Sequence, residues 1–281
     1  MEGVGRLSRV GTAVVEGEIS VGISQISKTV TQRNIEEGLR QLGLDRGDVV
    51  EVHSSLSSFG WVEGGAAAVV DALMAVVGEE GALVMSAYPV SKLLPLTEAE
   101  KARGILAKVQ LFGEDYDGPT GMGVIADEFR HRPGTVLGPG FHRVCAWGRD
   151  AALHAERGYA HLLEVDGWVL GLGVDIHYCS SMHQAEIGVE FPEAIKRYFQ
   201  VPEDIRRDYP DDYYISYGST PDDAWGKVQD EAERREQVWR RRIGQAECVL
   251  FKARVVVGIY GEWLRTDPFG LHGVEREKAG P

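Results

Sequence analysis

Hydrophobic residues begin to recur with a helical period directly after Thr31. Thr31 suits a helix N-cap, and Val30 and Ile35 are spaced as a hydrophobic staple. The apolar stripe continues to Gly43, a typical helix end. The pattern therefore predicts a helix over 31–43, and residues 1–28, which show no sustained period, are predicted to form an N-terminal extension.

A strand, a helix and a second strand are predicted next. Residues 48–53 and 82–87 read as buried strands, and residues 66–77 between them read as a helix. A loop rich in Gly and Ser, residues 54–65, joins the first strand to the helix. This order is a βαβ unit, so we expect an α/β fold with a mainly parallel central sheet flanked by helices.

The rest of the chain adds further elements. Strands are predicted at 144–148, at 168–172 and at the start of 248–264, which ends in a helix. The other predicted helices lie at 97–111, 123–132, 181–190 and 231–243. Residues 200–226 are polar and aromatic and are predicted to form a smaller C-terminal insertion of helix and loop. At 281 residues, we expect one domain over 29–275.

The composition excludes several classes of protein. With 43 acidic and 30 basic residues, the formal net charge is −13, which argues against binding to nucleic acid or to an anionic membrane. The three cysteines are too few for a disulfide framework or a thiolate zinc cage. We find no apolar run near the ~20 residues that span a bilayer and no secretory signal at 1–19, so we expect a soluble, cytoplasmic protein.

The loop after the first strand is the first candidate site. In a parallel α/β sheet, ligands bind beyond the carboxyl ends of the strands, where this loop would lie. Its hydroxyls and the backbone N–H groups at the following helix start suit an anionic or amide-rich ligand. The candidate binding residues are Ser54, Ser55, Ser57, Gly64 and Gly65. The alternative is that these residues only form a turn and cap a helix.

The second candidate site is the pair His183 and Glu186. On a helix, residues three apart share a face, so the carboxylate could fix the imidazole tautomer for a general base acting near neutral pH. Chance His-x-x-Glu pairs are common, however. A zinc site that includes His177 and Cys179 lacks the usual spacing, so we expect no metal. Cys179 as a covalent nucleophile is a further alternative to a packing role.

A third segment is both acidic and aromatic. Residues 208–223 contain five Asp and four Tyr without any Lys or Arg. The segment is either a solvated flap or a binding surface for a polycationic, hydroxyl-rich ligand, because Asp pairs with ammonium groups and aromatic faces stack on sugars. The candidate substrate-binding residues are Asp211, Asp212, Tyr213, Asp222 and Asp223.

Several blocks of sequence resemble one enzyme family. They are VEVHSSLSSFGWVEGGAAAVVDAL at 50–73, VGEEGALVMSAYP at 77–89, PTGMG at 119–123, EFR at 128–130, AWG at 146–148, VLGLG at 169–173 and HQAE at 183–186. Together they span about 31–191 and resemble the aminoglycoside 3-N-acetyltransferase family. These enzymes transfer acetyl from acetyl-CoA to an amine of an aminocyclitol antibiotic.

The resemblance implies an α/β fold, acetyl-CoA as co-substrate and a role for each matched residue. His183 would be the general base with Glu186 as its partner, and direct transfer would need no nucleophile. The residues that would line the pantetheine arm of CoA are His53, Ser54, Ser55 and Ser57. The chain departs from the family pattern at 137–143, in a shortened stretch at 151–167 and around Cys179, which bear on the expected CoA and acceptor surfaces.

Two other functions compete with acetylation of an aminoglycoside. The acceptor could instead be another small amine metabolite, or the chain could be a non-catalytic binder of CoA or aminoglycoside. The sequence leaves the oligomeric state open. The charge of −13 fits the aminoglycoside hypothesis, because a negative cleft would attract a polycation and no nucleic acid or membrane partner is expected.

Overall fold

The computed structural model describes residues 29–111, 118–140, 142–209 and 213–276. The predicted N-terminal extension, 1–28, therefore lies outside the described residues. Two of the predicted substrate-binding residues, Asp211 and Asp212, also lie outside them.

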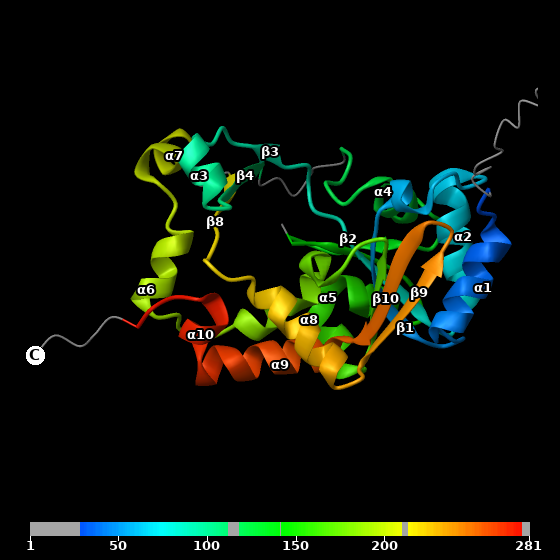
Figure 1. Ribbon diagram of the computed structural model, residues 1–281. Helices are drawn as coiled ribbons and strands as arrows, with labels where there is room; N and C mark the ends of the chain where they lie inside the picture. Colours follow the sequence, from blue (N-terminus) through cyan, green and yellow to red (C-terminus); the bar gives the residue numbers. More distant parts are fainter. Residues whose placement is uncertain (1–28, 112–117, 141, 210–212, 277–281) are drawn as a thin grey trace, which may run out of the picture.

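A seven-stranded sheet forms the centre of the protein (Figure 1). Its strands, in spatial order, are β5 (Val136–Leu137), β6 (Val144–Gly148), β2 (Ala82–Ser86), β1 (Val49–Ser54), β7 (Trp168–Leu172), β10 (Ala246–Lys252) and β9 (Val238–Ile243). β1 is parallel to β2 and β7, whereas β6 and β10 are antiparallel to the strands on both of their sides. Five of the seven strands thus run in one direction, which confirms the predicted α/β fold with a mainly parallel sheet.

Helices cover both faces of this sheet. One hydrophobic core includes residues of α1 (Gln32–Leu42), α2 (Gly65–Val77) and α4 (Val124–Arg130). The other includes residues of α5 (Ala151–Glu164), α8 (Ala224–Arg234) and α9 (Ala253–Thr266). In β1, Val50 and Val52 belong to the first core and Val49 to the second, so the strand is buried on both faces. Each such side chain contributes about 1.5–3 kcal/mol when fully buried.

The first predicted helix forms between the two residues predicted to end it, Thr31 and Gly43. The Thr31 side chain accepts from the backbone N–H of Asn34, and the Asn34 side chain accepts from the backbone N–H of Thr31 in return. The helix ends at Gly43, whose φ of 118° is a left-handed conformation that glycine adopts without strain. The staple residues Val30 and Ile35 are both buried in the same core.

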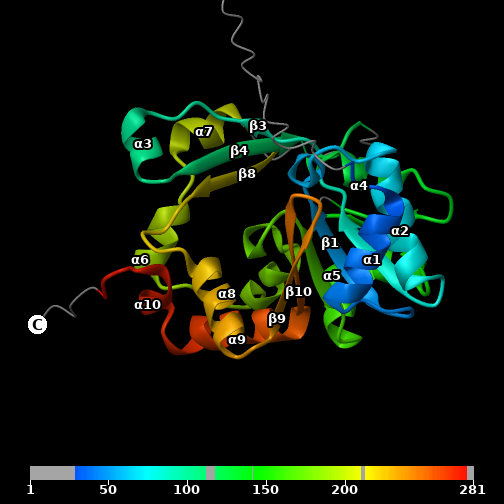
Figure 2. The same ribbon diagram turned by 45° about the vertical axis from the view of Figure 1, so that its right-hand side comes forward.

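A second, smaller sheet lies beside the main body (Figure 2). It is antiparallel and consists of β3 (Lys92–Leu93), β4 (Leu106–Leu111) and β8 (Tyr213–Gly218). Three short helices accompany it, α3 (Glu98–Ala102), α6 (Glu193–Lys196) and α7 (Glu203–Asp208), and α10 (Pro268–His272) follows α9. The insertion predicted around 200–226 thus contains β8, which pairs with a strand about a hundred residues earlier.

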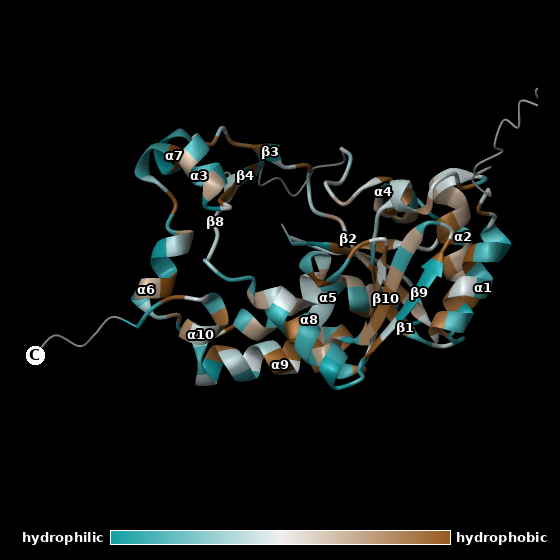
Figure 3. Ribbon diagram, viewed as in Figure 1, coloured by the Kyte–Doolittle hydropathy of each residue, from teal (hydrophilic) through white to brown (hydrophobic). Residues whose placement is uncertain are grey.

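Three helix predictions are wrong in part. Residues 97–111 form α3 and then β4, separated by Gly104 with φ of 71°. Residues 181–190 contain a 3-10 turn, Ser180–Glu186, and no α-helix. Residues 231–243 contain the end of α8 and then β9. β9 was hidden in the sequence because it is an edge strand with consecutive exposed Arg residues, and Figure 3 shows its polar character beside hydrophobic β10.

No helix among the described residues is long and apolar enough to cross a membrane.

Candidate active site

His183 lies in the 3-10 turn Ser180–Glu186, which we call the His183 turn. Its Nδ1 lies 2.8 Å from Glu186 Oε2, and the hydroxyl of Tyr260 in α9 donates to Glu186 Oε1 at 2.9 Å. Both carboxylate oxygens are therefore fixed. With Nδ1–H donating to Glu186, Nε2 is the ring nitrogen that can accept a proton. The ring also meets the edge of Trp225 at a centroid distance of 5.0 Å.

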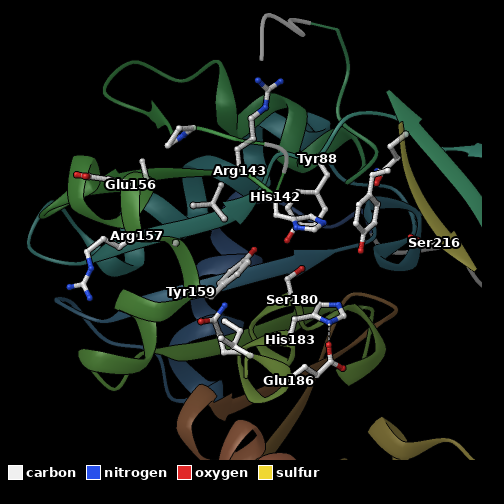
Figure 4. A pocket seen from close by; sticks show the side chains of 18 of the residues that line it. Tyr88, His142, Arg143, Glu156, Arg157, Tyr159, Ser180, His183, Glu186 and Ser216 are labelled. Atoms are coloured by element: carbon white, nitrogen blue, oxygen red, sulfur yellow. Dashed lines mark hydrogen bonds and ion pairs between the residues drawn. The ribbon is translucent and has the colours of Figure 1, made fainter. Parts of the chain in front are cut away.

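Four cavities border His183, and one of them, of about 470 Å³, is lined by His183, Glu186, Phe191, Lys196, Phe199, Tyr260 and His272. The inner cavity, of about 350 Å³, is lined among others by His53, Ser54, Ser86, Tyr88, Ser180 and His183. The acidic cavity, of about 640 Å³, is lined among others by Arg103, His177, His183, Glu186, Asp222, Asp223 and Trp225. The Lys108 cavity, of about 560 Å³, is lined among others by Tyr88, Lys108, His142, Arg143, Ser180, His183, Glu186 and Ser216. Figure 4 shows Ser180, His183 and Glu186 on one side of the Lys108 cavity, across from Tyr88 and His142.

The serine-rich loop lines a further cavity. It has about 840 Å³, and its lining includes Ser54, Ser55, Ser57, Gly64 and Gly65, with Gly121, Met122 and Tyr178. We call it the Ser loop cavity. Ser54, Met122 and Tyr178 line the inner cavity as well, so the two cavities adjoin. The structure thus brings together five of the six residues predicted to bind the cofactor, on a path that ends at His183.

The sixth of these residues, His53, has a different environment. Its side chain is buried, and its Nε2 lies 2.6 Å from Oε1 of Glu51 and 3.3 Å from the backbone N of Ser180. His53 borders the inner cavity, but this nitrogen already has partners within the protein. Glu51 was not predicted from the sequence, because a glutamate in a buried strand carries no motif.

A chain of hydroxyls also reaches the site. The Tyr159 hydroxyl lies 2.5 Å from Ser86 Oγ, which lies 3.0 Å from Ser180 Oγ. Burial raises the pKa of Tyr159 well above its ordinary value, so the phenol stays protonated and can donate into the chain. Tyr159 comes from α5 and Ser86 from β2, and no local sequence signal links them to Ser180.

The three described substrate-binding candidates of the acidic segment lie in different places. Asp222 and Asp223 line the acidic cavity, and their role in substrate binding stays a prediction. Asp223 caps α8 by accepting from the backbone N–H of Gly226 at 2.9 Å, and Asp222 pairs with Lys227 at 2.7 Å. Tyr213, in contrast, packs against Tyr209, the residue after α7, and is not among the described residues that line these cavities.

His177 joins two walls of the acidic cavity. Its Nδ1 lies 2.8 Å from Asp175 and its Nε2 lies 2.6 Å from Asp223. Burial disfavours the charged ring, but the hydrogen bonds and charges of Asp175 and Asp223 outweigh burial and raise the pKa of His177. The imidazolium form therefore ties the loop before the His183 turn to the start of α8.

The structure gives no support to the two alternatives, a covalent nucleophile at Cys179 and a metal site. Cys179 is buried and its Sγ lies 3.3 Å from the Ser181 hydroxyl. Burial raises the pKa of its thiol well above the ordinary value, which disfavours the thiolate a nucleophile needs. Within the described part of the chain, no group of three or more His, Cys, Asp or Glu side chains could hold a metal ion.

The α/β sheet and the His183–Glu186 pair, set where separate cavities meet, suit an enzyme that brings two substrates together. The chain belongs to the aminoglycoside 3-N-acetyltransferase family, since the sequence model of that family matches residues 52–265. The family resemblance predicted from the sequence is thereby confirmed.

Individual relatives agree. The chain is 29% identical over 254 residues, 83% of its length and 92% of the relative's, to the SPbeta prophage-derived aminoglycoside N(3')-acetyltransferase-like protein YokD of Bacillus subtilis. Two solved structures share the fold. Aminoglycoside acetyltransferase AAC(3)-IVa in complex with gentamicin is 21% identical, with a TM-score of 0.65 over 86% of this chain and 90% of that one. AAC-IIIb with CoASH is 21% identical, with a TM-score of 0.62 over 84% and 97%.

Proposed function

We propose that the protein transfers the acetyl group of acetyl-CoA directly to the 3-amino group of an aminoglycoside, with His183 as general base. The observation that carries this proposal is the His183–Glu186 pair at the point where the inner cavity and the acidic cavity meet. Membership of the family and the CoASH and gentamicin complexes of its structural relatives support the two substrates.

Acetyl-CoA would occupy the Ser loop and inner cavities. Hydroxyls and backbone N–H groups at Ser54, Ser55 and Ser57 suit the amides of the pantetheine arm, and the N–H groups at the start of α2 suit a negative charge. The left-handed φ of 79° at Gly64 and 60° at Gly65 lets the backbone turn into the helix. The thioester would then lie beside Ser180 and His183.

The aminoglycoside would occupy the acidic cavity. The carboxylates of Glu186, Asp222 and Asp223 outnumber the cations Arg103 and His177 in the lining of this cavity, which leaves a negative charge for ammonium groups, and Trp225 adds an aromatic face. The Lys108 cavity is a poorer fit for a polycation, because Lys108 and Arg143 belong to its lining. The net charge of −13 would favour the approach of the polycation at low salt.

The groups at this site can carry out each proton transfer of the reaction. Nε2 of His183 accepts a proton from the amine as the amine nitrogen attacks the carbonyl carbon of the thioester. The carbonyl oxygen becomes negative and needs a donor, for which the Ser180 hydroxyl, hydrogen-bonded to Ser86, is placed beside the base. Collapse breaks the carbon–sulfur bond, and the imidazolium returns its proton to the departing CoA thiolate. Holding both substrates supplies the orientation of a near-intramolecular reaction.

A second candidate function keeps acetyl-CoA and changes the acceptor. Lys108 lines both the inner cavity and the Lys108 cavity, so a small amine that carries an anionic group would find a cation near the base. This acceptor class fits the Lys108 cavity better than a polycation does.

A thiol-release assay separates these functions. The protein is incubated with acetyl-CoA and either an aminoglycoside panel or small amines that bear a carboxylate or phosphonate. We expect turnover with aminoglycosides, and a loss of about 10²–10⁴-fold in His183→Ala at unchanged acetyl-CoA affinity. Turnover only with the anionic amines would replace the first function by the second. Tight binding without thiol release from any acceptor would mean a non-catalytic binder.

A further inference from the structure

The His183 turn is anchored by side chains of β1. The residue before the turn, Cys179, provides no side-chain cap. Instead, the backbone N–H of Ser180 donates to Nε2 of His53 at 3.3 Å, and the backbone N–H of Ser181 donates to Oε1 of Glu51 at 3.1 Å. The first two N–H groups of the turn therefore find their acceptors on a strand about 130 residues earlier.

We propose that Glu51 and His53 are positioning residues for acetyl transfer, which hold the His183 turn over the inner cavity as one hydrogen-bonded pair. This inference rests on the proposed function of His183. The pair acts on the backbone of the turn, and it needs no contact with either substrate.

The location of Glu51 argues against a role in packing alone. Glu51 is fully buried in the central strand β1, between β2 and β7. Val49, two residues earlier on the same face, packs in a hydrophobic core. A valine at position 51 would avoid the cost of burying a carboxyl group, which is several kcal/mol unless its hydrogen bonds are made. The hydrogen bonds to His53 and to the backbone of Ser181 therefore explain why a glutamate occupies this position.

The contacts also join the two side chains to each other. Nε2 of His53 lies 2.6 Å from Oε1 of Glu51, the same oxygen that accepts from the backbone N–H of Ser181. Oε2 of Glu51 is buried without a hydrogen-bond partner among the described residues, so Oε1 makes both of these contacts of the side chain. The two side chains thus form one hydrogen-bonded unit, and a change in either disturbs both contacts to the turn.

Three other titratable groups lie near this pair. Burial raises the pKa of the Cys179 thiol and of the Tyr88 and Tyr159 hydroxyls, and the electrostatic interaction with Glu51 adds to the rise. All three stay protonated near pH 7, so none of them adds a charge beside the anchor.

The geometry of a 3-10 turn explains why anchoring its start matters. Such a turn has three residues per turn, so side chains at i and i+3 lie above one another. Ser180, His183 and Glu186 follow this spacing and form one row. Fixing the backbone at Ser180 and Ser181 thus sets the direction of the row that contains the base. A misplacement of about 1 Å can cost about 10²-fold in rate.

The test compares Glu51→Leu and Glu51→Gln with Val50→Ala. Val50 is a matched control because it lies in the same strand, packs on the opposite face and lines none of the cavities described above. We expect Glu51→Leu to lower kcat at least ~10-fold with both KM values within about threefold. Glu51→Gln, which keeps a side-chain oxygen to accept from the N–H of Ser181, should recover most of this loss. Val50→Ala should lower the unfolding temperature and leave kcat near the parent value.

Two further readouts complete the experiment. The pH profile of Glu51→Gln should keep the midpoint of its acid limb, because the anchor acts on the backbone of the turn and takes no part in the proton transfer. Amide hydrogen exchange, measured by NMR without any acceptor, should accelerate at Ser180 and Ser181 in Glu51→Leu and stay unchanged along β1. This readout holds even if no aminoglycoside is a substrate, so failure of the proposed function is distinguishable from failure of the anchor.

Four results would overturn the proposal: a kcat in Glu51→Leu above half of the parent value, a loss of kcat in Val50→Ala as large as in Glu51→Leu, a shifted pH midpoint in Glu51→Gln, or unchanged exchange at Ser180 and Ser181.

Discussion

Glu186→Gln removes the negative charge behind His183 while keeping the shape of the side chain. In the proposed mechanism, the imidazolium formed when His183 accepts the amine proton then loses the attraction of a carboxylate whose Oε2 lies 2.8 Å from Nδ1. For charges centred about 4 Å apart, this attraction is about 1 kcal/mol in water and about 4 kcal/mol at an effective dielectric constant near 20.

Exposure decides between these two values. The His183 side chain is 61% exposed and that of Glu186 is 31% exposed, so the attraction lies toward the lower value, about 1–2 kcal/mol. Since about 1.4 kcal/mol corresponds to a tenfold change in rate, we expect kcat to fall about 5–30-fold. Initial rates of thiol release at saturating substrates measure this loss, and the KM for acetyl-CoA should not change.

The chain offers a matched control. Glu164 also follows a histidine by three residues, with Oε2 3.1 Å from Nδ1 of His161, but neither residue lines the cavities described above. Glu164→Gln should therefore keep the parent kcat. The reasoning is refuted if Glu186→Gln stays within twofold of the parent, or if the Glu164 variant loses as much activity.

Three other outcomes are expected. Asp223→Asn keeps an oxygen to cap α8 but loses its charge, so the aminoglycoside KM should rise severalfold and vary less with salt, and an unchanged KM would exclude Asp223 from the acceptor site. The raised pKa of His177 stabilises the fold fully below its unfolded value of about 6.5, and this stabilisation is lost as pH rises through the folded value. His177→Ala should thus lower the urea midpoint more at pH 6 than at pH 9. An equal loss at both pH values would show that the ion pairs of His177 with Asp175 and Asp223 do not stabilise the fold. Leu170→Ala, at a fully buried site in β7, should cost about 2–5 kcal/mol by urea unfolding, and a cost under 1 kcal/mol would show that the site collapses around the smaller side chain.

Elements with local signals were predictable from the sequence. The capped helix α1 and the unit β1–α2–β2 follow from periodicity and from Thr31, Gly43 and Gly78, whose effects act within a few residues. The strand β4 was not predictable as such, because its partner β8 lies about a hundred residues later. Before that pairing is known, the charged stretch over 97–111 favours a helix throughout.

The residues of the candidate site also divide into those with a local sequence signal and those without one. The pair His183 and Glu186 was predicted from its spacing together with the family resemblance, and the spacing still brings the two side chains together because residues three apart share a face in a 3-10 turn as they do in an α-helix. Glu51 and Tyr159 were missed, because their contacts to the His183 turn or to β2 join residues 130 and 73 positions apart. Such contacts depend on which strands become neighbours, and no local pattern encodes that choice.

The meeting of the cavities at His183 has a consequence for how products leave. The Ser loop and inner cavities reach the imidazole along one path, and the acidic cavity reaches it along another. If the two substrates bind as proposed, CoA and the acetylated amine would leave independently, each through its own opening. CoA would then compete with acetyl-CoA for the same cavities and would not compete with the aminoglycoside. The position of one histidine would thus set the routes by which both products leave.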